Sequence, residues 1–291
     1  AEHERERFST TYDTHKRAKM VSAHALVGWV GGAFSLAAGA RIDDHSGFGS
    51  QWSLGANGAV QFAPGWRARA SYGEGFKAPT LYQLYSDYGD AGLRPERSKS
   101  YDIGIERGTR GDGLHLAATL FRRDSRDLID FASCTAGQCA TRPFGLYQNV
   151  GLARAQGIEV ELGARISERF RAQAAYSHAE TENRTPGSAN SGKALARRPA
   201  HTVTVALDWQ TPLPGLELGG DIRMVSESFD DAGNFRRMDG YALGAVRARL
   251  PVNSAIELYG RIENVTDTQY ETAAGYGTAG RSAFVGARAR F

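Results

Sequence analysis

The sequence predicts an all-β fold, a transmembrane antiparallel up-and-down β-barrel, and three observations lead to this prediction. Apolar and polar side chains alternate in about fourteen successive segments, as in strands with one face in lipid and the other in water. The connections between these segments alternate between short and long. The 35 glycines and 10% aromatic residues fit strands and tight turns better than long helices.

The last segment, 281–291, shows the alternation most clearly. If it is extended, one face carries Ala283, Val285, Ala287, Ala289 and Phe291, and the other carries Ser282, Phe284, Gly286, Arg288 and Arg290. A soluble sandwich would bury the apolar face against a second sheet, whereas a membrane barrel shows it to lipid and turns the arginines toward a wet lumen. Because the pattern recurs along the whole chain, the barrel is favoured.

One segment offers an alternative to a strand. Residues 20–40 contain no Asp, Glu, Lys or Arg, and the segment is about as long as a membrane-spanning helix. Four glycines weaken such a helix. The turn signal Gly31-Gly32 instead separates two alternating stretches, so a β-hairpin is favoured.

The connections set the expected orientation. The short ones are Gly31-Gly32, Pro64-Gly65, 110–113, 167–168, 212–215 and 251–254, and the longer, more polar ones are 9–17, 43–49, 77–99, 134–144, 184–197, 230–237 and 268–280. Outer-membrane barrels have short turns on the periplasmic side and long loops outside. The last strand is therefore expected to run toward the periplasm.

Bulk composition does not oppose this fold. The hydrophobic fraction of 41% resembles that of a soluble protein, but half of each spanning strand is polar. The net charge of +3 and the absence of a Lys/Arg block argue against a nucleic-acid partner. The chain has neither an initiator Met nor a signal peptide, so it is expected to lack its N-terminal part.

The two cysteines, Cys134 and Cys139, lie in one predicted loop. No further Cys and no nearby His completes a zinc site, so no metal site is expected. A local disulfide formed in an oxidising compartment is the preferred interpretation.

Four stretches resemble the TonB-dependent receptors, gated outer-membrane transporters for siderophores and cobalamin. They are Tyr72–Tyr85 (YGEGFKAPTLYQLY), Leu93–Glu106 (LRPERSKSYDIGIE), Ile262–Tyr270 (IENVTDTQY), and Gly280-Arg281 leading to the terminal Phe291. Each is weak alone, but their order and spacing together form a specific signal. They cover about the last three-quarters of the chain, and strand alternation covers the rest.

The resemblance implies a barrel of about 22 strands around a plug domain. Residues 1–291 would then be the C-terminal portion of the barrel, with about fourteen strands and no plug. The implied function is energy-coupled uptake of a scarce chelate, a ferric siderophore or cobalamin, across the outer membrane of a Gram-negative bacterium. The implied partners are TonB, through the missing plug region, the chelate, outer-membrane lipid and lipopolysaccharide, and the barrel-assembly machinery. Alternatives are a non-transporting barrel (an autotransporter translocator or adhesin) and a passive porin.

The candidate ligand-binding residues lie in the loop near the first resembling stretch: Tyr82, Tyr85, Asp87, Tyr88 and Asp90. Aromatic rings with a few polar groups suit a flat chelate or a corrin ring. The alternative is that these tyrosines pack the loop against the barrel rim or belong to the interfacial girdle. Likewise, Arg197-Arg198 could steer an anionic chelate or meet lipopolysaccharide phosphates.

No enzyme and no cofactor is expected. The seven histidines are scattered, and no nucleophile elbow or phosphate loop is present. Acidic and basic side chains share the predicted lumen face of many strands. They could hold a polar plug, or they could pair across neighbouring strands and only stabilise the wall.

The terminal Phe291 is expected to be a barrel-assembly signal, because it ends the lipid-facing row of the last strand. Its deletion from the full-length protein should lower outer-membrane levels while leaving the substrate affinity of the surviving molecules nearly unchanged. Outer-membrane fractionation at equal expression measures this. Normal abundance of the deletion variant would show instead that Phe291 is an ordinary girdle aromatic.

Overall fold

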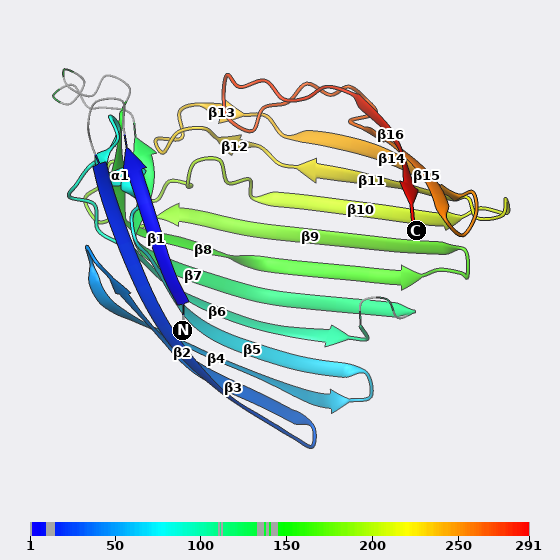
Figure 1. Cartoon of the computed structure of the whole chain (residues 1–291), viewed down its shortest axis with the longest axis horizontal. Coiled ribbons are helices and arrows are strands. Elements are labelled where there is room, and N and C mark those ends of the chain that lie inside the picture. Colours follow the sequence, from blue (N-terminus) through cyan, green and yellow to red (C-terminus); the bar gives the residue numbers. More distant parts are fainter. Residues whose placement is uncertain are drawn as a thin grey trace.

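The computed structural model describes residues 2–9, 15–109, 111, 113–132, 137, 140 and 145–290. Fourteen strands form one antiparallel sheet in chain order, and β12 and β13 form a small second sheet (Figure 1). The predicted all-β, up-and-down order of about fourteen strands is therefore confirmed. The elements are β1 (Glu2–Ser9), β2 (His15–Gly31), β3 (Phe34–His45), β4 (Gly49–Ala63), β5 (Trp66–Lys77), α1 (Leu81–Tyr85), β6 (Glu96–Arg107), β7 (Leu114–Ala132), β8 (Leu146–Arg165), β9 (Phe170–Asn183), β10 (His201–Gln210), β11 (Glu217–Val225), β12 (Ser228–Phe229), β13 (Arg237–Met238), β14 (Tyr241–Pro251), β15 (Ile256–Glu263) and β16 (Ser282–Ala289).

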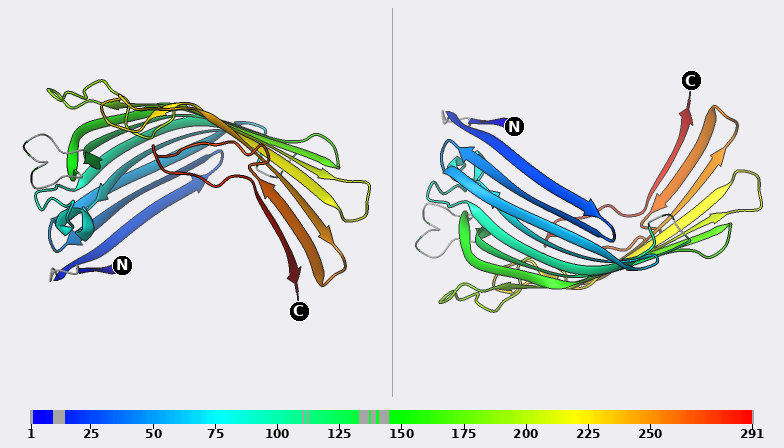
Figure 2. Two further views of the ribbon diagram at one scale, coloured as in Figure 1. Left: turned by 90° about the horizontal axis from the view of Figure 1, so that it is seen from above. Right: turned by 90° about the horizontal axis from the view of Figure 1, so that it is seen from below.

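The sheet curls into an open trough (Figure 2). Strands β1 and β16 lie at its two edges, and within the described residues they do not pair with each other. Helix α1 lies on the concave side, where it packs against Ala18 of β2. Because side chains alternate along a strand, the side chain of Val27, an odd number of positions from Ala18, points to the convex side.

The convex face is apolar and exposed. Val27 is 75% exposed and Val285 is 90% exposed. Both belong to the alternating rows that the sequence assigns to lipid. An exposed apolar surface of this extent is what a lipid-facing wall requires, because lipid and not a second sheet covers it.

The segment 20–40 forms the predicted β-hairpin of β2 and β3. Val27 pairs with Ala38 and Gly31 pairs with Phe34 across a turn in which Gly32 has a φ of +56°. Glycine adopts this left-handed conformation without the steric cost that a side chain would add. None of the helices that the structure describes is long and apolar enough to cross a membrane.

Most of the remaining connections follow the predicted alternation, and the clearest exception is 43–49. Residues 43–49 were expected to form a longer loop, but β3 continues to His45 and β4 begins at Gly49. The polar residues that suggested a loop belong to strands. Asp43, for example, lies on the concave face and accepts a 2.6 Å hydrogen bond from Ser22 Oγ. This prediction was therefore wrong, because a polar concave wall has the same composition as a loop.

Successive strands are staggered, so a row of directly paired residues drifts from one end of the strands to the other. One row of directly paired convex-face residues begins at Trp29, beside a short turn, and ends at His201, beside a long loop. The row is Trp29, Leu36, Gly58, Ala70, Ile103, Leu120, Ile158, His178 and His201. Such a stagger is the geometry of tilted barrel strands.

Charged side chains on the concave face pair across neighbouring strands. Arg247 of β14 bonds Asp221 of β11 at 3.1 Å and also reaches Asp208 of β10. Arg288 of β16 contacts Glu257 of β15 at 3.0 Å. Of the two interpretations of the lumen charges, pairing within the wall is the one that the structure shows for these residues.

The pairing of β8 with β9 depends on Gly157. A Cβ placed there would lie 1.8 Å from the carbonyl oxygen of His178, whereas a Cβ at Gly163 on the same strand would meet only His115 Cβ at 3.6 Å. We therefore expect Gly157→Ala to disrupt assembly of the full-length protein and Gly163→Ala to leave it intact. Heat-modifiable migration on gels measures the folded fraction. Equal folded fractions for the two variants would contradict the proposed close contact.

Candidate functional site

The candidate site is built on the segment between β5 and β6. Helix α1 begins with a capping box: Thr80 Oγ1 accepts from the backbone N–H of Gln83 at 3.2 Å, and Gln83 Oε1 accepts from that of Thr80 at 3.0 Å. The backbone N–H of Leu81 donates to Glu6 Oε1 of β1 at 3.2 Å. These bonds hold a five-residue helix that would not be stable by itself.

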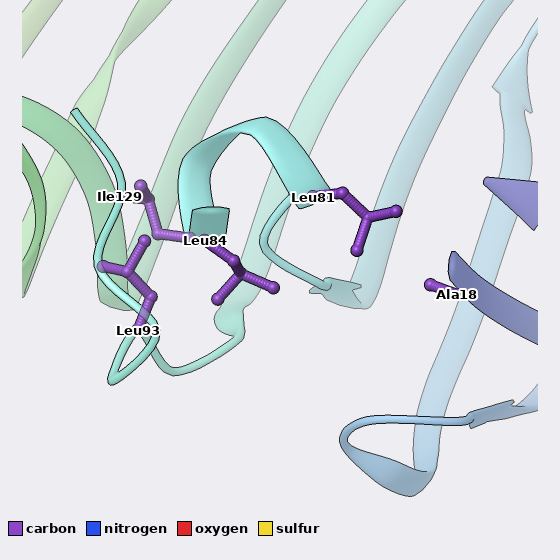
Figure 3. Packing of buried hydrophobic residues seen from close by; sticks show 5 residues of the cluster. All are labelled: Ala18, Leu81, Leu84, Leu93 and Ile129. Carbon is purple, nitrogen blue, oxygen red and sulfur yellow. The ribbon is translucent and has the colours of Figure 1, made fainter. Parts of the chain in front are cut away.

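Apolar side chains fix this helix to the concave wall. Leu81 and Leu84 of α1, Leu93 from the following turn, Ala18 of β2 and Ile129 of β7 form one buried cluster (Figure 3). The cluster lies at the long-loop end of the sheet. Within the part of the chain that the structure describes, it is the main apolar core, and most other large apolar side chains there are exposed.

Aromatic rings from four separate segments meet above this core. Phe8 contacts Tyr82 with ring centroids 5.9 Å apart, Tyr82 contacts Tyr147 at 6.1 Å, Tyr147 contacts Phe131 at 5.4 Å, and Phe131 contacts Tyr88 at 5.9 Å. We call these five residues the mouth cluster. All four contacts are edge-on, the arrangement that aromatic quadrupoles favour.

The structure places the five predicted site residues in four different surroundings. Tyr82 and Tyr88 belong to the mouth cluster, and Tyr82 remains 44% exposed. Tyr85 lies under Lys16, whose Nζ is 4.8 Å from the ring centroid. Asp90 shapes the turn, because its Oδ1 accepts from the Gly92 N–H at 2.8 Å. Asp87 is exposed.

Sequence reasoning missed Phe8, Phe131, Tyr147 and Lys16. Phe131 and Tyr147 are direct cross-strand partners on β7 and β8. An aromatic residue on each side of the predicted loop 134–144 was an available signal. Phe8 and Lys16 are far from the loop in sequence, and only the fold brings them there.

Burial sets the electrostatics of the mouth. Burial raises the pKa of Tyr147, and neighbouring Tyr82 and Asp130 raise it further, so this phenol stays neutral. Burial also raises the pKa of Asp130, which lies beyond the apolar band, although the Phe131 N–H and the charges of Arg198 and Arg197 oppose the rise. Arg197 and Arg198 therefore both act on Asp130, the sequence neighbour of Phe131 in the mouth cluster.

Three long loops on the other side of the mouth are tied together. Arg197 Nε donates to Asp230 Oδ1 at 2.7 Å, and the Ala274 N–H donates to the same oxygen at 3.1 Å. Lys193 Nζ donates to the Gly233 carbonyl at 2.6 Å. Arg197, considered as a steering charge from the sequence, is therefore engaged in a loop contact.

A cavity of about 560 Å³ lies beside the mouth cluster on the concave face. Its lining includes Glu4, Glu6, Arg41, Asp43 and His45. Arg41 bonds Asp43 at 2.8 Å and Glu2 at 3.0 Å. The mouth therefore combines an aromatic surface with a polar, mixed-charge recess. No group of three or more His, Cys, Asp or Glu that could hold a metal ion occurs among the described residues.

Two other predicted sites cannot be placed. Cys134, Cys139 and Phe291 lie outside the residues that the structure describes. The disulfide and the assembly signal stay predictions.

Comparison with known proteins identifies the class. The family described as TonB dependent receptor-like, beta-barrel matches residues 6–265, and the chain belongs to this family. The resemblance found in the sequence is thereby confirmed.

Solved structures share the fold. A point mutant of the ferric enterobactin receptor PfeA from Pseudomonas aeruginosa matches with a TM-score of 0.78 and 21% identity, over 97% of this chain and 46% of that chain. The siderophore receptor PirA from Acinetobacter baumannii matches with a TM-score of 0.75 and 18% identity, over 96% and 46%. The ferric-catecholate import receptor Fiu from E. coli K12 matches with a TM-score of 0.73 and 16% identity, over 94% and 45%. The chain spans less than half the length of these proteins.

The hydrogen bonds of Asp230 with Arg197 and Ala274 predict that the contact between the three long loops depends on pH. Burial would raise the pKa of Asp230, but the hydrogen bonds from Arg197 and Ala274 outweigh it and lower the pKa below its usual 3.8. The contribution of Asp230 is therefore full above pH 3.8 and lost as the pH falls through the lowered pKa. At neutral pH, Asp230→Asn should weaken the tie by about 1 kcal/mol, since Arg197 is half exposed.

Hydrogen exchange of backbone amides in loop 184–200 measures this weakening. We expect exchange about fivefold faster in Asp230→Asn than in the wild type at pH 7. Asp239→Asn is the matched control, because Asp239 is 95% exposed and reaches Arg237 only at 4.0 Å. Unchanged exchange in Asp230→Asn would show that the loops do not depend on this bond.

Proposed function

We propose that this chain is the C-terminal barrel portion of an outer-membrane receptor that takes up a ferric siderophore by TonB-dependent energy coupling. The family supports the receptor class. The observation that favours a chelate is the mouth cluster, which presents partly exposed rings from four segments on the concave face. Aromatic surfaces with few polar groups suit a flat or ring-bearing ligand.

Charge supports an anionic chelate. Lys16 stands over Tyr85, and Arg197 and Arg198 act on Asp130 beside Phe131. A ferric complex of an aromatic siderophore offers both rings for edge contacts and negative charge for these cations. Cobalamin, also expected from the sequence, offers a large flat ring with less negative charge, and we place it second.

The partners and the cellular location expected from the sequence belong to the same proposal. The partner for energy coupling is TonB, reached through a plug domain outside residues 1–291, and the location is the outer membrane of a Gram-negative bacterium. Lipid, lipopolysaccharide and the barrel-assembly machinery are the other partners. An adhesin, an autotransporter translocator or a passive porin would use the same wall without a ligand at the mouth.

Ligand binding to the full-length protein tests the proposal. Fluorescence quenching with ferric catecholates, ferric hydroxamates and cobalamin should detect binding of a ferric siderophore. Tyr82→Ala should weaken it about tenfold, because the variant removes a central ring of the mouth cluster. Tyr101→Ala is the matched control, since Tyr101 is 46% exposed but lies on the convex face.

Uptake in cells separates the alternatives. Growth under iron limitation should require both the receptor and TonB. Binding of no chelate, or solute flux that is the same with and without TonB, would reject the proposal and favour a passive or adhesive barrel.

A further inference from the structure

One side chain holds the far end of the segment between β5 and β6, residues 78–95, which we call the inner segment. Asn149 of β8 accepts a hydrogen bond from the backbone N–H of Arg94 through Oδ1 at 2.9 Å. Its Nδ2 donates to the carbonyl oxygen of Arg94 at 2.9 Å and to that of Asp127 on β7 at 2.6 Å. A carboxamide has two N–H donors and an acceptor oxygen, so it can bond a neighbouring backbone in both directions.

The ladder does not hold this end of the inner segment. β6 pairs with β7 only as far as Arg97. Pro95, two residues earlier, has no N–H to donate. On β7 the pairing with β8 passes over Asp127, which has a φ of +56°. Arg94 and Asp127 therefore lie outside the ladder, and the Asn149 side chain bonds backbone groups of both.

An ion pair joins the same three residues, which we call the clamp. Arg94 Nη2 donates to Asp127 Oδ1 at 2.5 Å. The Arg94 side chain is 69% exposed, and an exposed ion pair contributes little to stability. Asn149 is partly buried. Its three hydrogen bonds therefore account for most of the stability of the clamp.

The clamp is continuous with the apolar packing of the inner segment. Leu93, the neighbour of Arg94, is 4% exposed and packs in the buried cluster with Leu81 and Leu84 of α1 (Figure 3). Tyr82 of the mouth cluster lies between these two leucines in the helix. The orientation of its ring therefore depends on how firmly Leu93 and Arg94 are held.

β8 holds the inner segment at a second point. Tyr147 lies two residues before Asn149 and on the same face of the strand. Its backbone N–H donates to the carbonyl oxygen of Tyr88 at 2.8 Å, and its ring contacts Tyr82 and Phe131. Because both contacts come from one strand, release of the segment at Asn149 also weakens the contact at Tyr147.

We infer that Asn149 is a positioning residue for the ligand mouth, because it fixes the inner segment so that Tyr82 and Tyr88 present one arrangement of rings to the chelate. The inference rests on the proposed function and names a residue through which the same site works. Asn149 acts through the backbone of Arg94 and not by contact with the ligand. A surface that is ordered before the ligand arrives loses less conformational entropy on binding. Loss of the clamp therefore lowers affinity without removing a ring.

Chelate binding by the full-length protein tests the inference. Asn149→Ala should weaken binding of the ferric siderophore about tenfold, because three hydrogen bonds are lost. Asn149→Asp keeps the size and the acceptor but cannot donate at neutral pH, so it should weaken binding as well. Asn57→Ala is the matched control, because Asn57 also lies on the concave face and forms no side-chain hydrogen bond with the residues that the structure describes. Wild-type affinity in both Asn149 variants would overturn the inference.

A double-mutant cycle separates positioning from a general loss of stability. If Asn149 acts through the mouth cluster, Asn149→Ala should weaken binding by about threefold or less when Tyr82→Ala is already present, because the two effects are coupled. Heat-modifiable migration on gels gives the folded fraction, to which each affinity is normalised. The full tenfold loss in both backgrounds would show that Asn149 does not act through Tyr82 and would overturn the inference.

Hydrogen exchange keeps the inference distinct from the proposed function, since it needs no ligand. Backbone amides of residues 81–94 should exchange at least about fivefold faster in Asn149→Ala than in the wild type. Faster exchange in a protein that binds no chelate supports the clamp and rejects only the proposed transport function. Unchanged exchange overturns the inference whether or not a chelate binds.

Discussion

The uninterrupted antiparallel ladder is the constraint on which the rest of the structure depends. In lipid every backbone N–H and C=O group needs a partner, so each strand must pair on both sides along its spanning length. Pairing then fixes the face of every side chain, because a slip of one residue would exchange the two faces. The row from Trp29 to His201 keeps one face across nine paired residues. The apolar wall, the polar trough and the mouth all follow from that register.

Much of the wall could be predicted because its information is local. Alternation marks each strand, and Gly31-Gly32 and Pro64-Gly65 mark turns that the structure places between β2 and β3 and between β4 and β5. The prediction failed at residues 43–49 because polarity was taken as evidence for a loop. In a wall with a wet face, residues such as Asp43 are polar for the same reason that loop residues are, and composition alone does not separate the two cases.

The mouth could be predicted only in part, since its information is not local. A run of tyrosines in one loop pointed to Tyr82 and Tyr88, and the structure places both in one aromatic cluster. Their partners Phe8 and Tyr147 come from strands that are adjacent to the loop only after the sheet has curled around α1. The sequence contains the capping box at Thr80 and the leucines of α1. Their role in holding the loop against the concave wall depends on Ala18 and Ile129, which lie far away in the chain.

Ion pairs across neighbouring strands neutralise many charges on both faces, and a few like-charged pairs are exceptions. On the concave face Arg165 and Arg171 are direct partners of like charge, and they line a cavity of about 390 Å³ with His115 and Glu161. The concave face is polar and open to water, which screens the repulsion between the two arginines. The pairs Arg5–Lys19 and Arg7–Arg17 stand at the edge of the apolar band, where water is scarcer and repulsion between like charges is stronger. In a closed barrel β1 pairs with a further strand on its free side, and that strand is one source of counter-charge for Arg5 and Arg7.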